Sequence, residues 1–463
     1  MKAARRGAGG PADKEMPIAE IAPLLARGEV SPVDLVRKCL SRIAARPELN
    51  AFVTVLADRA LADAEAAAQD ISRGRYRGAL HGIPVSIKDL VHVAGVPTTS
   101  GSAVPPLHPV EDAPVVRRLR EAGAIIIGKT NLHEFAFGTT SEESAFGPVR
   151  NPYDTSRSAG GSSGGAAVAL VEGMCFGSIG TDTGGSIRIP AAACGVVGLK
   201  PTYGELPCEG VVPLSTTCDH IGPMTRSVAD ARIMFDVLKG TTPTGNSVDK
   251  QLTFGIPRGY LTERLDADVR RALERVRGAL TSSGHRTVDV EIDLARSTPD
   301  IYLHIVLPEA ATYHAPLLER HAPSYSPGVR IRLEMGRYVL AEDYVRAMRL
   351  RERLKGSVDT AFDECDALLL PALAIPAPEL GRQSVDIEGL PEPVRAAMLR
   401  LTQLFNLTGH PAIALPAGTS SSGLPIGMQL VGRCDETDRL LTIAASVEAQ
   451  MTAGPGSVGG GTG

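Results

Sequence analysis

The sequence lacks the features that mark several large classes of protein. Its 463 residues carry a net charge of only -4, which argues against a nucleic-acid binder that depends on clustered Lys and Arg. No apolar run approaches the roughly 20 residues needed to span a bilayer, so no membrane contact is expected. Apolar residues make up 43% of the chain and charged residues 22%. That composition is ordinary for a globular protein with a large core.

Paired cysteines and closely spaced histidines are also absent. The seven cysteines are odd in number, scattered and without a C-x-x-C pair, which favours reduced thiols in a cytoplasmic protein over a disulfide framework or a zinc site. The ten histidines include no H-E-x-x-H or H-x-H pair. We therefore predict no metal site.

The ends of the chain differ from its middle. Residues 1–16 contain Gly and Pro but lack the apolar segment of a secretory signal. Residues 450–463 are mostly Gly, Ser and Thr. We predict a disordered arm over residues 1–16, one folded domain over residues 17–449 and a disordered tail over residues 450–463.

Apolar periodicity within the domain predicts helices that alternate with strands. A helix is expected at Val115–Ala122, followed by a buried strand at Ala124–Ile127. A second helix is predicted by apolar residues at helical spacing, namely Val269, Ala272, Leu273, Val276 and Leu280. Further strands are expected at Leu252–Ile256, Val288–Ile292, Ala367–Leu370, Ala412–Leu415 and Met428–Val431. This alternation predicts an α/β fold, with a mainly parallel or mixed sheet covered on both faces.

One lysine stands among apolar neighbours. Val85, Ile87 and Leu90 flank Lys88, which predicts that Lys88 ends a buried strand. Burial disfavours the ammonium form, so the pKa of Lys88 should fall. The alternative is a surface or salt-bridged lysine paired with Asp89.

A Gly-rich segment, Ala159–Gly165, precedes the apolar and helix-compatible stretch Ala166–Glu172. A Gly-rich turn that opens a helix gathers unpaired backbone N–H groups beside the small hydroxyls of Ser162 and Ser163. A flexible linker is the alternative. A phosphate cradle is disfavoured, because neither G-x-x-x-x-G-K-[ST] nor a G-x-G-x-x-G after a strand is present.

A second Gly-rich turn leads to another serine. Thr183, Gly184 and Gly185 allow the backbone to turn sharply with its N–H groups pointing inward, and Ser186 then precedes a short predicted helix, Ile189–Cys194. Such a position suits a nucleophile with its own oxyanion donors, because backbone N–H groups need no reorganisation when negative charge develops.

Two charged residues flank this turn. We expect Asp182 and Arg188 to hold it by charge-assisted hydrogen bonds and not to act on substrate. The alternative for the whole segment is a purely structural Gly-rich turn.

Taken together, these segments resemble the amidase signature family, whose hallmark is Gly-Gly-Ser-Ser-Gly-Gly followed by Asp-x-Gly-Gly-Ser-Ile-Arg, with an upstream lysine. The resemblance extends over nearly the whole domain, through the stretches His81–Asp89, Gly128–Asn131, Gly147–Pro152, Gly195–Thr202, Asp219–Ser227, Gly409–Gly418 and Leu424–Gly432. It implies one α/β/α domain with a central mixed sheet of about eleven strands.

The resemblance also implies a Ser–Ser–Lys triad. Ser186 would be the nucleophile, Ser162 the bridging serine, preceded by a cis peptide bond, and Lys88 the base, with Ser163 in support. The oxyanion hole would be formed by the N–H groups of Thr183, Gly184, Gly185 and Ser186. The implied reaction hydrolyses an amide or carbamate with water through an acyl-enzyme, without a metal or cofactor and without a partner subunit.

Relatives in the family include the glutamine-hydrolysing subunit of tRNA-dependent amidotransferases. Arg332 is the candidate for the basic residue that those proteins use for the glutamine carboxylate. Their acidic residue for the α-amino group appears here as Leu399, by alignment of the stretch Asn406–Pro411. A lost counter-charge argues against glutamine.

The substrate pocket is harder to place. The loop Glu205–Thr217, with Pro207, Cys208 and Val211, either borders the pocket or is ordinary surface covering. A small amide or carbamate is the expected substrate. Two alternatives remain, namely an amidotransferase glutaminase subunit that works by docking a partner, and a catalytically dead structural member of the family.

Overall fold

The computed structural model describes residues 16–240 and 251–452. Most of the predicted arm and tail therefore lie outside the described residues. Helix α14 runs from Thr437 to Thr452, so the helix continues past Ala449, where we predicted the domain to end.

An eleven-stranded sheet runs through the molecule in the order β1-β3-β2-β4-β6-β5-β12-β13-β9-β7-β8. Parallel pairs join β2 to β3 and β4, and β7 to β8 and β9, whereas the other pairs are antiparallel. The sheet is therefore mixed, as the resemblance implied. Its strands are β1 (Phe52–Val55), β2 (Pro84–Lys88), β3 (Ile125–Thr130), β4 (Gly177–Asp182), β5 (Val197–Lys200), β6 (His220–Thr225), β7 (Thr253–Pro257), β8 (Arg286–Val290), β9 (Ala367–Pro371), β12 (Ala412–Thr419) and β13 (Pro425–Val431). A separate hairpin pairs β10 (Ser384–Ile387) with β11 (Leu390–Pro393).

Helices pack against the sheet and against one another. They are α1 (Ile18–Ala26), α2 (Pro32–Ala45), α3 (Ala57–Ser72), α4 (Pro114–Glu121), α5 (Gly164–Val171), α6 (Arg188–Cys194), α7 (Val228–Lys239), α8 (Ala267–Ser282), α9 (Thr298–His321), α10 (Pro327–Gly336), α11 (Ala341–Ala361), α12 (Val394–Leu399) and α13 (Gln403–Leu407) together with α14. Short 3₁₀ helices lie at Pro47–Leu49, Glu134–Ala136, Gly259–Leu261, Ala295–Ser297 and Ala322–Ser324.

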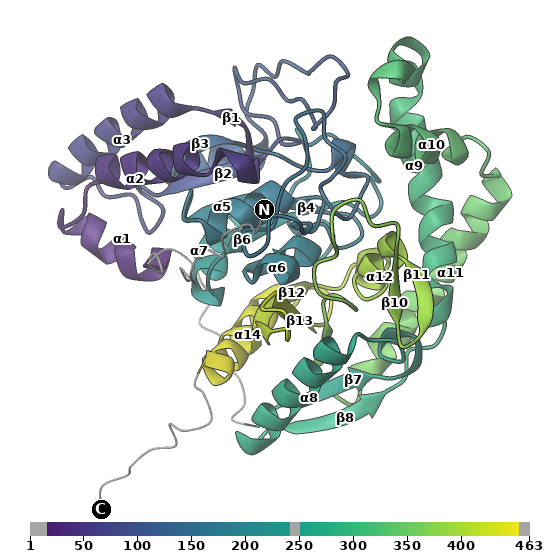
Figure 1. Ribbon diagram of the computed structural model, residues 1–463. Coiled ribbons are helices and arrows are strands. Elements are labelled where there is room, and N and C mark those ends of the chain that lie inside the picture. The colour runs from purple at the N-terminus through teal and green to yellow at the C-terminus, as the bar shows by residue number, and fades with distance from the viewer. Residues whose placement is uncertain (1–15, 241–250, 453–463) are drawn as a thin grey trace, which may run out of the picture.

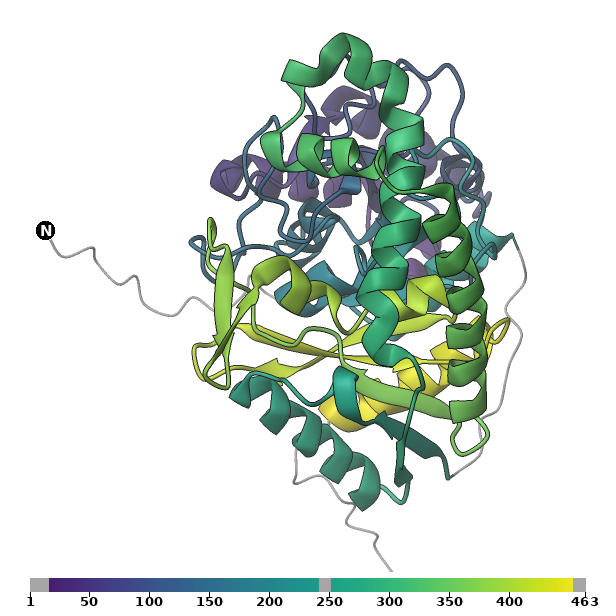
Figure 2. The same cartoon turned by 90° about the vertical axis from the view of Figure 1, so that its right-hand side faces the viewer.

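The views show how these helices cover the sheet. Helices α1 to α3 gather at the β1 end, while α9, α10 and α11 stand together on the other side of the molecule (Figure 1). Helices α8 and α14 lie on one side of the C-terminal strands and α12 lies on the other (Figure 2). Helix α6, which follows the second Gly-rich turn, packs on β5, β12 and β13. Among the described residues, no helix combines the length and apolar character needed to cross a bilayer.

The periodicity predicted the helices and most strands to within a few residues. All five residues of the predicted stripe on α8 are buried, namely Val269, Ala272, Leu273, Val276 and Leu280. Strand β8 ends at Val290, short of the predicted Ile292, which is nevertheless buried. Ile292 therefore contributes apolar burial, worth roughly 25 cal/mol per Å², without being part of the strand.

The strands that lead to the candidate site have no exposed face. Every residue of β2, β3 and β4 is buried. Because β2 and β4 run parallel and adjacent, Lys88 at the end of β2 and Asp182 at the end of β4 emerge at the same edge of the sheet. Ligands bind at this kind of edge in open α/β sheets.

Candidate active site

Lys88 ends strand β2 inside the protein and contacts the first Gly-rich turn. Its Nζ lies 2.7 Å from Ser162 Oγ and 2.8 Å from Thr181 Oγ1, and the side chain is fully buried. The alternative pairing with Asp89 is wrong. Asp89 instead forms a buried ion pair with Lys129, with Nζ and Oδ1 2.8 Å apart.

The surroundings of Lys88 favour an uncharged amine. Burial lowers its pKa to about 7, against the opposing influence of the Asp182 and Asp219 carboxylates. Near neutral pH a large share of Lys88 is therefore unprotonated. A neutral amine 2.7 Å from a hydroxyl can accept its proton.

Ser162 lies between the lysine and the second turn. The peptide bond from Gly161 to Ser162 is cis, and helix α5 begins two residues later. Its neighbour Ser163 donates a backbone hydrogen bond to the Ser186 carbonyl oxygen, with a length of 3.1 Å. The two Gly-rich turns are thus joined directly.

Ser186 sits in the turn between β4 and α6 and keeps 7% of its surface accessible. Its hydroxyl has no hydrogen-bond partner in the part of the chain that the structure describes. No hydrogen bond joins Ser162 Oγ to Ser186 Oγ in the described part of the chain. Catalytic hydrogen bonds often tighten only when substrate fills the site.

The ion pair between Asp182 and Arg188 holds the second Gly-rich turn in place, as we expected of these two residues. The Arg188 guanidinium donates to both carboxylate oxygens of Asp182 at 3.0 and 3.1 Å. It also donates to Gln429 Oε1 at 3.0 Å and to Asn406 Oδ1 at 2.7 Å. Burial alone would raise the pKa of Asp182, but the Arg188 charge, the hydrogen bonds from Arg188 and a hydrogen bond from Asn406 Nδ2 to Asp182 Oδ1 lower it below its usual range.

Replacing Arg188 by methionine should therefore destabilise the fold. Arg188 and Asp182 are both fully buried, and removing one partner of such a pair leaves an uncompensated charge that costs about 3–5 kcal/mol. Chemical denaturation measures this loss in the free energy of unfolding. The matched control is Arg346→Met, whose side chain is 68% exposed, and its loss should stay below about 1 kcal/mol. Equal losses in the two variants would contradict the network's role.

The predicted oxyanion donors divide into two groups. The backbone N–H of Gly185 donates to Asp182 Oδ1 at 2.7 Å, so this N–H is occupied and our prediction of it as an oxyanion donor is wrong. Among the described residues, the N–H groups of Thr183, Gly184 and Ser186 have no protein partner. These three can face a developing negative charge.

Glycine is required in this turn for steric reasons. A Cβ at Gly184 would lie 2.5 Å from Tyr302 Oη, and a Cβ at Gly185 would overlap the Thr402 side chain. Gly185 also has a φ of 132°, which disfavours any residue with a side chain.

A second carboxylate fixes the loop beyond the turn. Asp219 accepts hydrogen bonds from Thr183 Oγ1 at 2.6 Å and from the backbone N–H groups of Leu214 and Ser215 at 2.9 and 3.1 Å. Burial raises the pKa of Asp219 to about 6. The sequence analysis did not predict Asp219 as a site residue. Its only signal there was its place in the stretch Asp219–Ser227, which resembles the family.

A cavity of about 550 Å³ lies near the turn, although no residue of the turn is part of its wall. Tyr302 and Leu399, which touch the position of a Gly184 Cβ, are part of its wall. Of the predicted pocket residues, Arg332 and Leu399 line this cavity, whereas Pro207, Cys208 and Val211 do not.

The 205–217 loop lies beside Asp219 and the end of β2. Val211 pairs with Val91 in an isolated β-bridge, and Cys208 Sγ lies 3.8 Å from the Asp219 carbonyl oxygen. These contacts hold this part of the loop over the end of β2 and beside Asp219, and the predicted role of Pro207, Cys208 and Val211 at the border of a substrate pocket stays a prediction.

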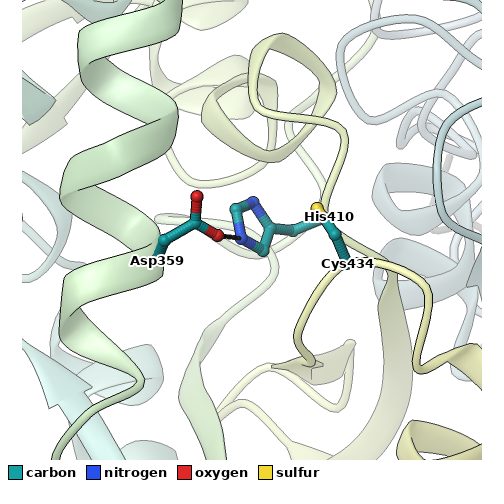
Figure 3. A group of neighbouring side chains, drawn as sticks. All are labelled: Asp359, His410 and Cys434. Carbon is teal, nitrogen blue, oxygen red and sulfur yellow. Dashed lines mark hydrogen bonds and ion pairs between the residues drawn. The ribbon is translucent and has the colours of Figure 1, made fainter.

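One group of side chains in the described residues offers ligand atoms for a metal ion. Asp359, His410 and Cys434 bring one such atom each within 4.8 Å of the others (Figure 3). However, His410 Nε2 lies 3.0 Å from Asp359 Oδ1 and Nδ1 lies 2.9 Å from Thr408 Oγ1. Both imidazole nitrogens are thus engaged in hydrogen bonds that anchor the segment before β12. The seven cysteines, all within the described residues, form no disulfide with one another.

Comparisons with known proteins agree with these motifs. The amidase family model matches residues 34–441. An amidase of Pseudomonas putida is 39% identical over 425 residues, which cover 88% of this chain and 90% of that protein. A glutamyl-tRNA(Gln) amidotransferase subunit from Anaeromyxobacter dehalogenans is 37% identical over 465 residues, covering 91% and 93% of the two chains.

The fold is shared as well. The crystal structure of an amidase superposes with a TM-score of 0.91 at 41% sequence identity, covering 94% of this chain and all of that one. The eleven-stranded mixed sheet is therefore the sheet of this family. On the sequence motifs, the sheet and these matches, the chain belongs to the amidase signature family, and it is a hydrolase that acts on C–N bonds.

Proposed function

We propose that the protein hydrolyses small amides or carbamates through an acyl-enzyme on Ser186, with Lys88 as the base and Ser162 as the relay. The carrying observation is the 2.7 Å approach of Lys88 Nζ to Ser162 Oγ in a setting that lowers the lysine pKa to about 7. A serine hydroxyl at its ordinary pKa is a weak nucleophile, and an adjacent neutral base activates it.

The proton path follows from this geometry. Neutral Lys88 takes the Ser162 proton while Ser162 takes the proton of Ser186, whose oxygen attacks the carbonyl carbon. The tetrahedral oxyanion is stabilised by the free N–H groups of the turn, a contribution of about 3–4 kcal/mol per donor in comparable hydrolases.

Collapse of the intermediate then needs an acid. The proton on Lys88 returns through Ser162 to the leaving nitrogen, because an amine leaves poorly unless it is protonated. Water attacks the acyl-enzyme by the same relay in reverse and releases the carboxylic or carbamic acid. No step calls on a metal ion or an organic cofactor.

The glutaminase alternative is supported by the amidotransferase relatives and by Arg332 in the cavity wall. Leu399 counts against it. This apolar side chain lines the cavity, and by the resemblance it stands where the amidotransferase subunits carry an acidic residue for the α-ammonium group, whose charge is costly to bury unpaired. We therefore favour a hydrolase that works without a partner subunit. The absence of disulfides among the seven cysteines supports a cytoplasmic location.

A substrate panel tests the proposal. The purified chain is assayed alone on anilides, aliphatic amides, glutamine, esters and aryl carbamates, and we expect turnover of an amide or carbamate with glutamine among the poorest substrates. A fluorophosphonate should label Ser186. Absence of both turnover and labelling identifies a catalytically dead member, while glutamine turnover that appears only with a captured partner identifies the glutaminase subunit.

A further inference from the structure

A carboxylate on helix α9 holds the C-terminal part of the 205–217 loop. Glu309 is half-buried. Its Oε2 accepts hydrogen bonds from Ser215 Oγ at 2.7 Å and from the backbone N–H of Thr217 at 3.2 Å. Its Oε1 accepts from Thr217 Oγ1 at 2.8 Å and from Tyr344 Oη, on α11, at 2.9 Å. Glu309 therefore joins the loop to two helices through uncharged donors.

Both backbone polar groups of Thr217 have charged partners. Glu309 accepts from its N–H, and the Arg351 guanidinium, which comes from α11, donates to its carbonyl oxygen at 2.8 Å. A hydrogen bond with an ionised partner is about twice as strong as one between neutral groups. Two side chains of opposite charge thus fix this end of the loop.

The loop connects Glu309 to the second Gly-rich turn. Ser215, whose hydroxyl donates to Glu309, also donates its backbone N–H to Asp219 Oδ1 at 3.1 Å. The same carboxylate oxygen accepts from Thr183 Oγ1 at 2.6 Å. Thr183 is one of the three residues whose free N–H can face a developing negative charge. Only Ser215 and Asp219 separate it from Glu309.

Close packing does not replace these hydrogen bonds on the side of Glu309. A cavity of about 560 Å³ lies there, with Leu214, Glu309 and Tyr344 in its wall. Residues that border a cavity lack packed neighbours on that side. Without the carboxylate, the loop can therefore shift toward the cavity, and the Asp219 contacts of Ser215 shift with it.

Resting on the proposed hydrolase function, we infer that Glu309 is a positioning residue for the oxyanion hole. It does not touch the substrate. It fixes Ser215 and, through Asp219, the Thr183 side chain, so that the Thr183 N–H stays where the oxyanion forms. Backbone donors lower the barrier only when they are aligned before the charge develops. A displacement of about 1 Å caused by a distant change can lower the rate about 10²-fold.

Replacing Glu309 by leucine tests this role. We expect kcat for the best amide of the panel to fall about 10- to 100-fold with KM within about 3-fold, because the oxyanion contact is made in the transition state and not with the bound amide. The control is Glu319→Leu, an exposed residue of the same helix, which should leave both constants unchanged. A native kcat in Glu309→Leu overturns the inference.

The conservative variant Glu309→Gln should restore most of the activity, to within about 3-fold of the native kcat. Its amide oxygen can accept from the Thr217 N–H, while the hydroxyls of Thr217 and Tyr344 can turn and accept from its NH₂ group. Equal losses in the glutamine and leucine variants would show that the hydrogen bonds to the loop are not what matters.

A double-mutant cycle shows whether the effect reaches the turn through Thr183. Thr183→Val removes the hydroxyl that donates to Asp219. In that background Glu309→Leu should lower kcat by less than about 3-fold, because residues that act through one hydrogen-bond network are not additive. A loss as large as in the native background would contradict the inference, since Glu309 would then act by another route.

An aldehyde measures the oxyanion hole without turnover. The aldehyde with the acyl group of the best amide adds the Ser186 hydroxyl to give a hemiacetal, whose oxygen lies in the oxyanion position. Its Ki should rise in Glu309→Leu by the factor by which kcat/KM falls. The Kd of the amide, measured by calorimetry in the Ser186→Ala protein, should not change with Glu309→Leu. An unchanged Ki would overturn the inference.

Further readouts separate this inference from the proposed function and from loss of the fold. Turnover by the native chain that Ser186→Ala abolishes establishes the hydrolase, so a native kcat in Glu309→Leu then removes only the positioning role. A native chain without turnover and without aldehyde binding removes both. The kcat/KM profile of Glu309→Leu should keep the apparent pKa of about 7, because Lys88 and Ser162 are untouched.

Thermal unfolding shows whether Glu309→Leu is folded. If it is not, Ser215→Ala takes its place, because it removes one donor to Glu309 and keeps the backbone N–H that donates to Asp219. We expect kcat to fall about 3-fold or more with KM unchanged. The matched control is Thr312→Val, whose hydroxyl donates to Pro308 within α9. A native kcat in Ser215→Ala would overturn the inference.

Discussion

Replacing Ser186 by alanine is expected to lower kcat by at least about 10⁴-fold, since removal of the nucleophile alone in comparable serine hydrolases removes nearly all triad catalysis. The fold should survive. The change deletes one hydroxyl without a protein partner among the described residues, and the backbone hydrogen bond from Ser163 to the Ser186 carbonyl is retained. The measurement is steady-state turnover of the best amide of the panel, together with fluorophosphonate labelling.

The control is another buried serine of the same sheet. Ser178 Oγ on β4 accepts a hydrogen bond from Ser86 Oγ at 2.8 Å. Among the described residues, its side chain forms no hydrogen bond with either Gly-rich turn. Ser178→Ala should keep turnover within a few-fold. Residual activity above a few per cent in Ser186→Ala, after contamination is excluded by labelling, would mean that another group attacks the carbonyl.

Replacing Lys88 by methionine should have an effect of similar size, because no other group then accepts the proton from Ser162. Lys88→Arg should be equally inactive, since a guanidinium does not deprotonate in this pH range. In the native protein, kcat/KM should rise with pH and level off above an apparent pKa of about 7, because only the neutral amine can act as base. A flat profile between pH 5.5 and 9 would contradict the assignment.

The lowered pKa of Lys88 also makes the stability of the fold depend on pH. The unfolded chain keeps a proton on Lys88 up to its usual pKa of 10.5, whereas the folded chain releases it above about 7. The contribution of Lys88 to folding is therefore most unfavourable below about pH 7 and improves as pH rises toward 10. Measured by thermal unfolding, the Tm difference between Lys88→Met and the native protein should shift in the variant's favour toward low pH. A constant difference from pH 6 to pH 10 would show that the folded pKa is not lowered.

Local patterns in the sequence predicted much of the fold. The stripe on α8, the helix predicted at Val115–Ala122 and the buried run Ala124–Ile127 each depend on neighbours a few residues away. The number of strands and their mixed order came only from the family resemblance. Pairings such as β5 with β12 join residues more than 200 positions apart, and periodicity has no information about such partners.

Some residues of the candidate site could likewise be found from local patterns in the sequence, and others could not. The sequence singled out Lys88 because its neighbours are apolar, and Ser162 and Ser186 because glycines surround them. Asn406 and Gln429, which complete the Arg188 network, are single polar residues in apolar stretches and carry no local signal.

The pocket shows a related limitation. Tyr302 on α9 is remote in sequence from every motif, and only the packing of α9, α10 and α12 around one cavity brings it beside Gly184. For the 205–217 loop the sequence left a pocket border and a surface cover open, because a sequence does not tell whether an apolar loop faces a ligand or the core.

The Arg188 network has a consequence for the growing chain. Its guanidinium donates to acceptors on Asn406 in α13 and Gln429 in β13. During synthesis the nucleophile leaves the ribosome more than 200 residues before these partners do. The turn that carries the nucleophile therefore gains its full set of hydrogen bonds only after α13 and β13 have been synthesised and have packed against it.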